Sequence, residues 1–399
     1  MINIINMKRD DWIDANAACA LLGVKAQTLY AYVSRHSIRL KADPSDARHS
    51  LYFLPDLDRL LRLNRRPRAR ADVAQAAIRW GDPVLVTSIS EVRAGTIWLR
   101  GHAIEDCAQQ MTLEDAAALL CDFDHVVLPE TRVRISGTSP FARAMKALAD
   151  EADSAPSLAD RDPSDISVDV GRALSLVTNA CLAEPLSGPV HKRIGAKWGL
   201  TPQTSDVIRQ ALVLLSDHEL NPSTFAVRVC ASTGGSLAAA LLAGVATLSG
   251  PRHGGVRPFA SEALHAALED RLEPFLERNA EQPPYSFGFG HPLYPAGDPR
   301  AIYLLNLLPQ NSPIVQAVDK ASKRLSLPAN IDTALAAALR HFEWPDDAVA
   351  TIFSVGRTAG WAAHAIEQAL SGTMIRPRAK YQGKSIKSDI RLSETKREL

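Results

Sequence analysis

The sequence predicts a mainly α-helical protein in which a small basic unit precedes a larger helical body. After residue 70, apolar residues recur at spacings of three and four along most of the chain, as one face of a helix requires. Predicted strands and helices do not alternate along the sequence, so a parallel sheet is not expected. Charge divides the chain at the same place. Residues 1–72 hold thirteen Lys and Arg against eight Asp, a net charge of +5, so the remaining residues carry −4.

Length and composition are those of an ordinary globular protein. The 399 residues are 46% hydrophobic and 22% charged, and the formal net charge of +1 argues against nucleic-acid binding over the whole molecule. Five cysteines are scattered without the spacing of a zinc site or a disulfide framework. The first residues lack the apolar core of a signal peptide, and the most apolar run, 234–250, is too short and too rich in Gly and Ser to span a bilayer. We therefore expect a reduced, cytoplasmic protein with no membrane segment.

Residues 1–63 are predicted to form a small helix-turn-helix domain with a wing. Asp14 or Asn16 can cap a first short helix, and Gly23 can make the turn that follows it. The further elements expected are a second helix over 26–34, a hairpin over 38–53 and a third helix over 56–63. Arginines and a proline then predict a solvated linker over 64–77.

The stretch LGVKAQTLYAYVSRHSIR resembles the DNA-binding domain of MerR-type and excisionase-type proteins. The resemblance implies that one set of side chains faces a DNA groove and another meets phosphates. The groove set is Gln27, Thr28, Tyr30 and Arg35, and the phosphate set is Arg39, Lys41, Arg48 and the linker arginines. The alternative is a helical docking module whose basic residues form a solvated face. Asp43 and Asp46 in the wing count against tight phosphate contact.

The body, from residue 78 onward, is expected to be almost entirely helical. Clear examples of helical spacing are 112–123, 141–152, 205–220, 236–248 and 351–370. One short strand pair is expected within 83–101, and the polar, proline-containing stretch 149–165 is expected to be a loop.

Three histidines stand in unusual settings: His218 in SDHELNPST, His253 in SGPRHGG and His291 in FGFGHPLYPAGDPR. Each closes or follows a helix or a glycine turn, where backbone groups can meet a ligand and substrate can approach the main chain. Imidazole titrates near neutral pH, so it donates or accepts a proton readily. A lone histidine is more often structural, and the settings of these three are what make them candidates.

Three arginines and one aspartate complete the candidate set. Arg300, Arg357 and Arg376 lie at predicted helix ends or turns, and a guanidinium matches a carboxylate with two hydrogen bonds. Together with the histidines they favour a small di- or tricarboxylate as ligand. Asp332, in LPANIDTALAAAL, is either a catalytic base or the N-cap of a helix over 333–340.

Other chemistries lack their motifs. The spacings HExxH and HxxxH are absent, and no metal site is expected. The GxSxG motif of a serine hydrolase is absent, so that class of enzyme is not expected. The stretch GFGHPL lacks the third glycine and the surrounding strand–helix unit of a dinucleotide site.

Six motifs, in order, resemble the motif series of the citrate synthase family: DHELNPST, GPRHGG, GFGHPLYPAGDPR, NID, GRTAGWAAH and RPRAKY. The resemblance covers about 78–390. It implies a two-domain helical fold, with a large domain over 78–255 and 355–399 and a small domain over 256–354. Helix-turn-helix domains ahead of such a body are a recognised arrangement, which this chain resembles over its whole length.

The resemblance also implies a reaction, the condensation of acetyl-CoA with oxaloacetate to citrate and CoA. Asp332 would remove a proton from the thioester methyl group, and His253 would hydrogen-bond the enolate oxygen. His291 would polarise the ketone of oxaloacetate and protonate it. The carboxylates would be held by His218, Arg300, Arg357 and Arg376.

The same resemblance implies a homodimer, because the family's counterpart of Arg376 enters the neighbouring subunit's site. No permanently bound cofactor is implied, and acetyl-CoA or another acyl-CoA is the cosubstrate. Gly288, Phe289 and Gly290 are the candidate CoA-binding residues.

Three departures from the family pattern concern CoA affinity and acyl choice. Val256, Arg257 and Pro258 replace the usual Ala-Asn after GPRHGG, and 292–296 lack the basic residues of bacterial relatives. NIDTALAAA also lacks the family's aromatic residue and glycine. Three alternatives remain open: a 2-methylcitrate synthase using propionyl-CoA, a DNA-binding regulator that senses a tricarboxylate or acyl-CoA, and a helical scaffold with inactive sites.

Overall fold

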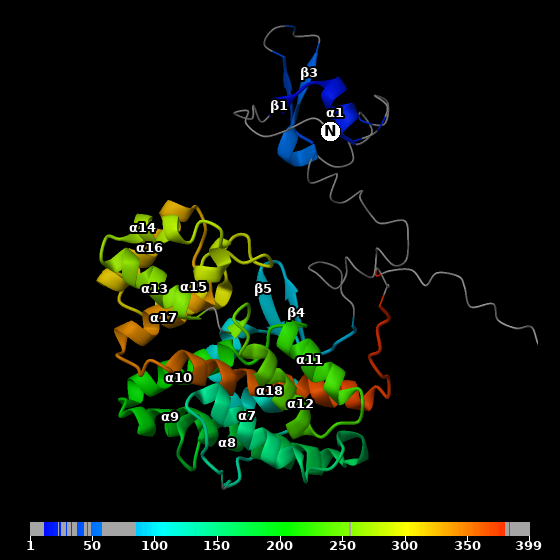
Figure 1. Cartoon of the computed structure of the whole chain (residues 1–399), viewed down its shortest axis with the longest axis vertical. Coiled ribbons are helices and arrows are strands. Elements are labelled where there is room, and N and C mark those ends of the chain that lie inside the picture. The colour runs from blue at the N-terminus through cyan, green and yellow to red at the C-terminus, as the bar shows by residue number, and fades with distance from the viewer. Residues whose placement is uncertain are drawn as a thin grey trace, which may run out of the picture. The chain divides into compact units, whose positions relative to one another are not determined.

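The computed structural model describes residues 85–131, 133–254 and 257–379, Gly383, and, nearer the N-terminus, 12–22, 24, 29, 33, 38–43, 46 and 49–57. The chain divides into two compact units (Figure 1). One consists of Met1–Val84 with Ala379–Leu399, and the other of Leu85–Arg378. Among the described residues, no helix is both long and apolar enough to span a bilayer.

The N-terminal unit contains a small antiparallel sheet and a helix that packs on it. Its elements are β1 (Trp12–Ile13), α1 (Ala15–Leu22), β2 (Leu40–Ala42) and β3 (Ser50–Phe53), with strand order β1-β3-β2. Asp14 caps α1, because its Oδ1 accepts the Ala17 N–H at 2.8 Å. The hydrophobic core is formed by Ala18, Leu29, Ile38, Tyr52 and Leu57. The antiparallel pairing of β2 with β3 confirms the hairpin predicted over 38–53.

All four residues predicted to contact a DNA groove lie outside the described residues. These are Gln27, Thr28, Tyr30 and Arg35, and Arg48 of the phosphate set lies outside the described residues as well. The winged helix-turn-helix assignment therefore stays a prediction. Two residues of the phosphate set, Arg39 and Lys41, are described. Arg39 forms an ion pair with Asp56 at 2.9 Å, and its guanidinium carbon lies 3.8 Å from the Phe53 ring centroid. The Lys41 ammonium lies 4.6 Å from the Trp12 ring centroid.

The body begins with a three-stranded antiparallel sheet and continues as helices. The strands are β4 (Ser90–Arg93), β5 (Thr96–Leu99) and β6 (His102–Ala103), in that order. The first helices are α5 (Ile104–Gln110), α6 (Leu113–Cys121), α7 (Pro140–Ala152), α8 (Pro163–Leu182), α9 (Val190–Trp198), α10 (Pro202–Leu214), α11 (Pro222–Ala231) and α12 (Leu237–Leu248). The last are α13 (Arg257–Leu268), α14 (Leu272–Arg278), α15 (Pro299–Asn306), α16 (Pro313–Leu325), α17 (Ile331–His341) and α18 (Ala348–Leu370), with short 3-10 helices η1 (Leu158–Asp160) and η3 (Pro284–Phe287).

Local capping chemistry explains where several of these helices begin. Thr112 and Asp115 form a capping box at the start of α6. Thr201 and Asn221 cap α10 and α11, and each is followed by a proline at the first helical position, where the missing N–H costs nothing. The predicted helix over 205–220 is corrected at its end. It stops at Leu214, and the remaining residues form the loop that carries His218.

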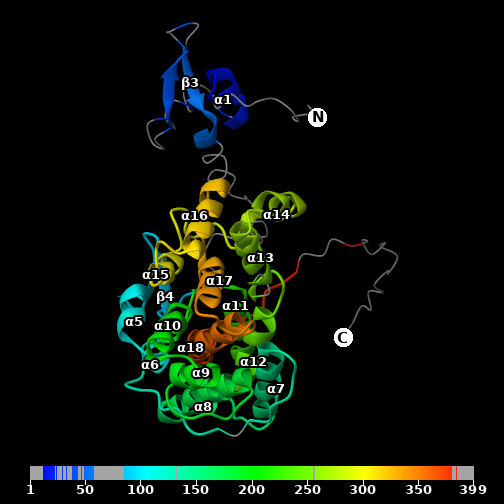
Figure 2. The same ribbon diagram turned by 90° about the vertical axis from the view of Figure 1, so that its left-hand side faces the viewer.

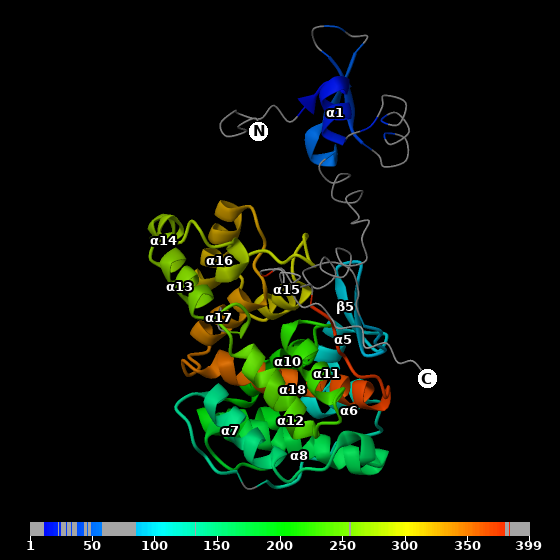
Figure 3. The same ribbon diagram turned by 45° about the vertical axis from the view of Figure 1, so that its right-hand side comes forward.

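Two hydrophobic cores stabilise the body. The larger core contains α6, α7, α8, α10, α12 and α18, and Trp361 of α18 is fully buried within it. The smaller core is built by α13, α14, α16 and part of α17. Figures 2 and 3 show α13, α14 and α16 at one end of the body, with α7 and α8 at the other. The predicted boundaries of a large and a small domain stay predictions.

The five cysteines are unpaired thiols, and three of them are buried. Burial raises the pKa of Cys107 to about 11 and the pKa values of Cys121 and Cys181 to about 12. Cys19 and Cys230 are partly exposed. Among the described residues, no group of three metal-ligating side chains is placed to hold a metal ion.

Candidate active site

His291 and Asp332 lie where the two cores of the body meet. The segment that follows η3 has Phe289 in the smaller core and Tyr294 in the larger core, and His291 lies between them in the chain. Helix α17 also contributes to both cores, through Ala334 on one side and Ala337 on the other. The sequence therefore places two candidate catalytic residues at the junction without burying either one completely.

His218 lies in the loop between α10 and α11 and is 8% exposed. Its Nε2 atom is 2.9 Å from the hydroxyl oxygen of Tyr294, and its ring meets the His291 ring edge to face, with centroids 5.2 Å apart. Burial, and then the positive charges of Arg300 and Arg357, hold the pKa of His218 well below its usual range. His218 is therefore neutral at physiological pH.

His291 has a defined tautomer in this arrangement. Its Nδ1 atom accepts the backbone N–H of Leu293 at 3.2 Å, so the hydrogen of the neutral ring is on Nε2. Burial, and then the charge of Arg300, lower the pKa of His291 to about 4. A neutral imidazole with an Nε2–H is suited to donate a hydrogen bond to a carbonyl oxygen.

Arg300 is held by a buried aspartate. Its Nε and Nη2 atoms donate to the two carboxylate oxygens of Asp298 at 2.9 and 2.8 Å, and both residues are at most 2% exposed. Burial raises the pKa of the Asp298 carboxyl, but Arg300 outweighs this effect and the pKa is lowered overall. Because two of its three nitrogens are engaged, Nη1 is the nitrogen of Arg300 outside this ion pair.

Asp298 and Asn330 tie the start of α17 to the segment that carries His291. The second carboxylate oxygen of Asp298 accepts the Ile331 N–H at 3.2 Å. Asn330 donates its backbone N–H to Gly288 O at 2.8 Å and its side-chain amide to Gly290 O at 3.2 Å. His291, Arg300 and the helix start are thus held by one set of hydrogen bonds.

The N-cap of α17 is Asn330, which corrects the alternative reading of Asp332 as the cap. The Asn330 side chain accepts the Asp332 N–H at 3.0 Å, and Asp332 lies in the first turn of a helix that begins at Ile331. Asp332 is partly exposed. Burial lowers the pKa of the Arg300 guanidinium, but Asp298, with Asp332 as a smaller contributor, raises it overall. Asp332 is therefore near Arg300 and accessible.

Gly288 and Gly290 have positive φ angles of 92° and 76°, which residues with a side chain rarely adopt. A Cβ atom on Gly288 would also overlap the Thr333 hydroxyl. Phe289 between them is 1% exposed, so its side chain serves the smaller core. CoA binding by these three residues stays a prediction. Because the glycines have no side chain and Phe289 is buried, their backbone groups are the ones available for it.

His253 lies in the turn after α12 and pairs with a serine at the start of α11. Its Nε2 atom is 2.9 Å from Ser223 Oγ. The single hydrogen of this hydroxyl can go to His253 or to Asn221 Oδ1, which is 2.7 Å away. Trp361 of α18 donates its Nε1–H to the same oxygen at 3.3 Å. Gly255 and Val256 lie outside the described residues, and α13 begins at Arg257.

The remaining two arginines differ in position. Arg357 of α18 is 2% exposed and donates its Nε–H to Leu215 O at 2.7 Å, beside the loop of His218. Arg376 is exposed in the segment after α18. The neighbouring Ile375 N–H donates to Ser232 at the C-terminal end of α11, whereas Ser223 and His253 lie at its N-terminal end. The structure thus brings Arg357 to the site and leaves Arg376 apart from it within one chain.

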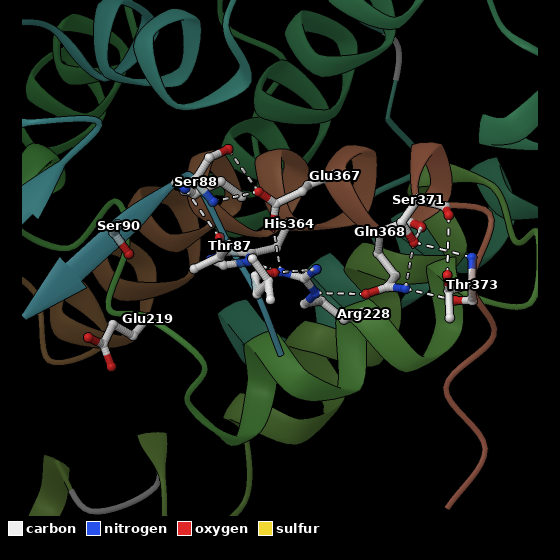
Figure 4. A network of polar contacts seen from close by, with 12 residues as sticks. Thr87, Ser88, Ser90, Glu219, Arg228, His364, Glu367, Gln368, Ser371 and Thr373 are labelled. Atoms are coloured by element: carbon white, nitrogen blue, oxygen red, sulfur yellow. Dashed lines mark hydrogen bonds and ion pairs between the residues drawn. The ribbon is translucent and has the colours of Figure 1, made fainter. Parts of the chain in front are cut away.

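A polar network joins residues of α11 and α18, and Ser90 of β4 lies near it (Figure 4). Asp217 accepts a hydrogen bond from Ser90 and lies 3.4 Å from His364 Nε2, with both Asp217 and His364 fully buried. Figure 4 shows Arg228 of α11 beside His364 and Glu367 of α18. Arg228 donates to Glu367 at 2.6 Å and to Gln368 at 2.9 Å. The loop is therefore fixed to β4 and α18, and α18 is bound in turn to α11.

Sequence patterns did not point to several residues that build the site. Tyr294, Asp298, Ser223 and Asn330 each contact a candidate residue, and none was a candidate itself. For Asp298 and Asn330 a signal existed, since each stands two residues before a candidate and can cap a helix. Ser223 and Tyr294 meet their partners from distant segments, which sequence spacing does not show.

Residues 181–378 match the family model described as citrate synthase, C-terminal domain. "Citrate synthase 2" of Bacillus subtilis is 32% identical over 194 residues, which is 46% of this chain and 52% of that protein. Most such relatives are likewise matched over about half their length, and they include a 2-methylcitrate synthase of Shewanella oneidensis.

Two comparisons extend over most of the chain. "Citrate synthase" of Mycolicibacterium smegmatis is 27% identical over 366 residues, covering 77% of this chain and 95% of that protein. The structure of citrate synthase from Thermoplasma acidophilum, a ternary complex with carboxymethyl coenzyme A and oxaloacetate, covers 78% of this chain and 97% of its own. Its TM-score is 0.60 at 21% identity, so it shows the fold. The family model and the relatives show that the body is similar to citrate synthases, and the solved structure shows that it shares their fold.

Proposed function

We propose that the body condenses acetyl-CoA with oxaloacetate to give citrate and CoA. The observation that carries this proposal is the convergence of His218, His291 and Arg300 around Tyr294. Asp332 lies in the first turn of α17, and the start of this helix is hydrogen-bonded to Gly290 and Asp298, on either side of His291 and Tyr294 in the chain. No permanent cofactor is needed for this chemistry, and the cytoplasm stays the predicted location.

Oxaloacetate is the substrate that the buried charges favour. Arg300 and Arg357 bring two positive charges close to neutral His218, and the ion pair with Asp298 compensates one of them. Arg357 and the Nη1 group of Arg300 are suited to the carboxylates, since a guanidinium matches a carboxylate in geometry. The Nε2–H of His291 would then meet the ketone oxygen.

Asp332 would begin the reaction by taking a proton from the methyl group of the thioester. The electron pair of that C–H bond moves onto the thioester oxygen, giving an enolate that an N–H donor stabilises. His253 would supply this N–H from Nδ1 when Ser223 donates its hydrogen to Nε2, 2.9 Å away. The Ser223 hydroxyl thereby selects which ring nitrogen of His253 carries the hydrogen.

The enolate carbon would attack the ketone carbon, and the ketone oxygen would take its proton from His291 Nε2. Citryl-CoA is then hydrolysed by water to citrate and CoA. We propose that the region over 256–354 closes on the rest of the body and excludes water before this step. The location of His291 and Asp332 at the junction of the two cores supports this closure.

A thiol-release assay with acetyl-CoA and oxaloacetate tests the proposed function. We expect CoA release that depends on both substrates, with citrate as the product by mass spectrometry. A faster rate with propionyl-CoA would make the protein a 2-methylcitrate synthase. The two thioesters differ by one methylene group, so the fit of the acyl pocket determines which one reacts faster. No CoA above background with either thioester would rule out the proposal.

We further propose a homodimer in which Arg376 completes the partner's site. The exposed position of Arg376, at the other end of α11 from Ser223, supports a role outside its own site. The partner site would be the place where this guanidinium meets a carboxylate.

A second function, DNA binding by the N-terminal unit, is favoured by its separate core and its net charge of +5 over 1–72. Two such units on a dimer would contact a two-fold symmetric site. The expected result is binding whose affinity falls steeply with salt and is lost on deletion of 1–70. An effect of citrate on this affinity would favour the regulator over the enzyme, and no salt-dependent binding would dismiss DNA as a partner.

A further inference from the structure

Tyr294 lies at the centre of the candidate site. It is 1% exposed, and its hydroxyl oxygen is 2.9 Å from His218 Nε2. Its ring centroid is 4.8 Å from that of His291 and 5.8 Å from the Arg300 guanidinium carbon. One side chain thus contacts three residues that the proposed function assigns to oxaloacetate.

The protonation states fix the direction of the hydrogen bond. Burial raises the pKa of the Tyr294 phenol, so its hydrogen stays in place. His218 is neutral, because burial and the charges of Arg300 and Arg357 keep its pKa well below the usual range. In the described part of the chain, His218 Nε2 is the hydrogen-bond partner of the phenol oxygen. Since a buried phenol normally donates to its partner, the hydrogen of His218 is on Nδ1.

We propose that Tyr294 is a positioning residue, which fixes His218 in the tautomer with hydrogen on Nδ1 so that it donates to a substrate carboxylate. This inference rests on the proposed function. A carboxylate accepts hydrogen bonds and donates none, so it binds the ring through an N–H. Without the phenol, neutral His218 would divide between two tautomers, one of which presents a bare nitrogen to the substrate.

The aromatic ring of Tyr294 makes a second contribution. It lies against His291 at an interplanar angle of 31° and beside Arg300. Phenylalanine would keep these contacts and lose the hydroxyl, whereas leucine would lose both. The two substitutions therefore separate the effect on His218 from the effect on His291.

Calorimetry with oxaloacetate and steady-state kinetics on the full chain provide the test. For Tyr294→Phe we expect the Kd and the KM for oxaloacetate to rise about 5- to 10-fold, as loss of one hydrogen bond implies. The kcat should stay within about twofold and the KM for acetyl-CoA should be unchanged, because the reacting atoms are not touched. For Tyr294→Leu the kcat should fall as well, by about tenfold or more.

Tyr303→Phe is the matched control. Tyr303 of α15 also donates a hydroxyl hydrogen, to Gln210 Oε1 at 2.7 Å in a partly buried hydrogen bond, but contacts none of the candidate residues through it. It should leave the Kd for oxaloacetate unchanged. An equal loss of affinity in Tyr303→Phe would assign the effect to general destabilisation and overturn the proposal.

Nitrogen-15 spectra of histidine-labelled protein report the tautomer directly, with His218→Gln used to assign the signal. We expect His218 protonated on Nδ1 in the wild type and a mixture of tautomers in Tyr294→Phe. Hydrogen on Nε2 in the wild type, or an unchanged Kd in Tyr294→Phe, would overturn the proposal. Wild type that binds oxaloacetate but releases no CoA would contradict the proposed function alone, and wild type that binds no oxaloacetate would overturn both.

Discussion

At the scale of single residues, the candidate site depends on pairs in which one side chain orients another. Asp298 holds Arg300, Asn330 caps the helix of Asp332, and Ser223 meets His253. Each partner is a short polar residue that accepts or donates at a defined distance. The orienting groups limit the rotamers of the residues that would meet substrate, which is how a protein preorganises a polar site.

Asp332→Asn removes the proposed base and keeps its size. We expect the kcat for CoA release to fall by about 100- to 10,000-fold, the usual contribution of a general base. The Kd for oxaloacetate should change little, since Asp332 is assigned to the thioester. Asp319→Asn, an exposed change on α16, serves as the control. Retention of more than about a tenth of the kcat would exclude Asp332 as the base.

His291 should make stability depend on pH. Its pKa is about 4 in the folded protein, below the ordinary value of 6.5. Between these values the unfolded chain binds the proton and the folded chain does not, so the free energy of unfolding falls as the pH is lowered from about 7 to 5, by about 2 kcal/mol for this ring.

Urea unfolding at pH 7 and pH 5 measures this contribution. In His291→Gln the difference between the two pH values should shrink by about 2 kcal/mol. His102→Gln, which changes an exposed histidine of β6, is the control. Equal pH dependence in wild type and His291→Gln would contradict the neutral, partly buried ring on which the proton-donor role depends.

At the scale of elements, two glycines of α18 allow two neighbouring segments to approach that helix closely: the C-terminal end of α10 at Gly356 and the loop of His218 at Gly360. A Cβ atom on Gly360 would overlap Ser216 O and Asp217 Oδ1, and one on Gly356 would lie 2.8 Å from Leu212 O. The Gly360 N–H donates to Ser216 O at 2.9 Å. Gly356 and Gly360 are four residues apart and lie on one face of α18, so this face leaves room for the neighbouring backbone.

Gly360→Ala should therefore weaken both the fold and the site. We expect a loss of about 1–3 kcal/mol in the free energy of unfolding, as overpacking produces, together with a higher Kd for oxaloacetate. Gly195→Ala in α9 is the comparison, because there the new methyl group would meet the Ser205 hydroxyl, which can rotate away. Its effect on stability should be smaller and its Kd unchanged. Equal effects would show that the Ser216–Asp217 backbone has room to shift.

At the scale of the whole molecule, the proposed dimer predicts complementation between inactive variants. In a heterodimer of Arg376→Ala and Asp332→Asn, one site would lack both groups and the other would have both. Random exchange of subunits should then restore about a quarter of the wild-type CoA release, since half of the dimers carry one complete site. No recovery, with exchange verified by mass, would place Arg376 in its own chain's site or outside catalysis.

The sequence predicted the helical body, the hairpin of the N-terminal unit and the histidines and arginines of the candidate site. Helical spacing and capping residues are local signals, and the chain follows them at Thr112 and Ser139. The end of α10 was predicted too late, because the apolar pattern continues through Leu214 and Leu215 while the backbone turns at Ser216. Tyr294 was missed because its meaning depends on His218, 76 residues away.

The buried cysteines have a practical consequence for measuring the reaction. Reagents that detect released CoA react with thiolates, and the raised pKa values of Cys107, Cys121 and Cys181 keep these groups protonated. We expect the native protein to give a small, slow background from Cys19 and Cys230, and the full signal of five thiols after unfolding in urea. Rapid labelling of all five in the native protein would mean that the larger core opens on the timescale of the assay. The same reagent thus reports both turnover and the closure of the core that contains three of its targets.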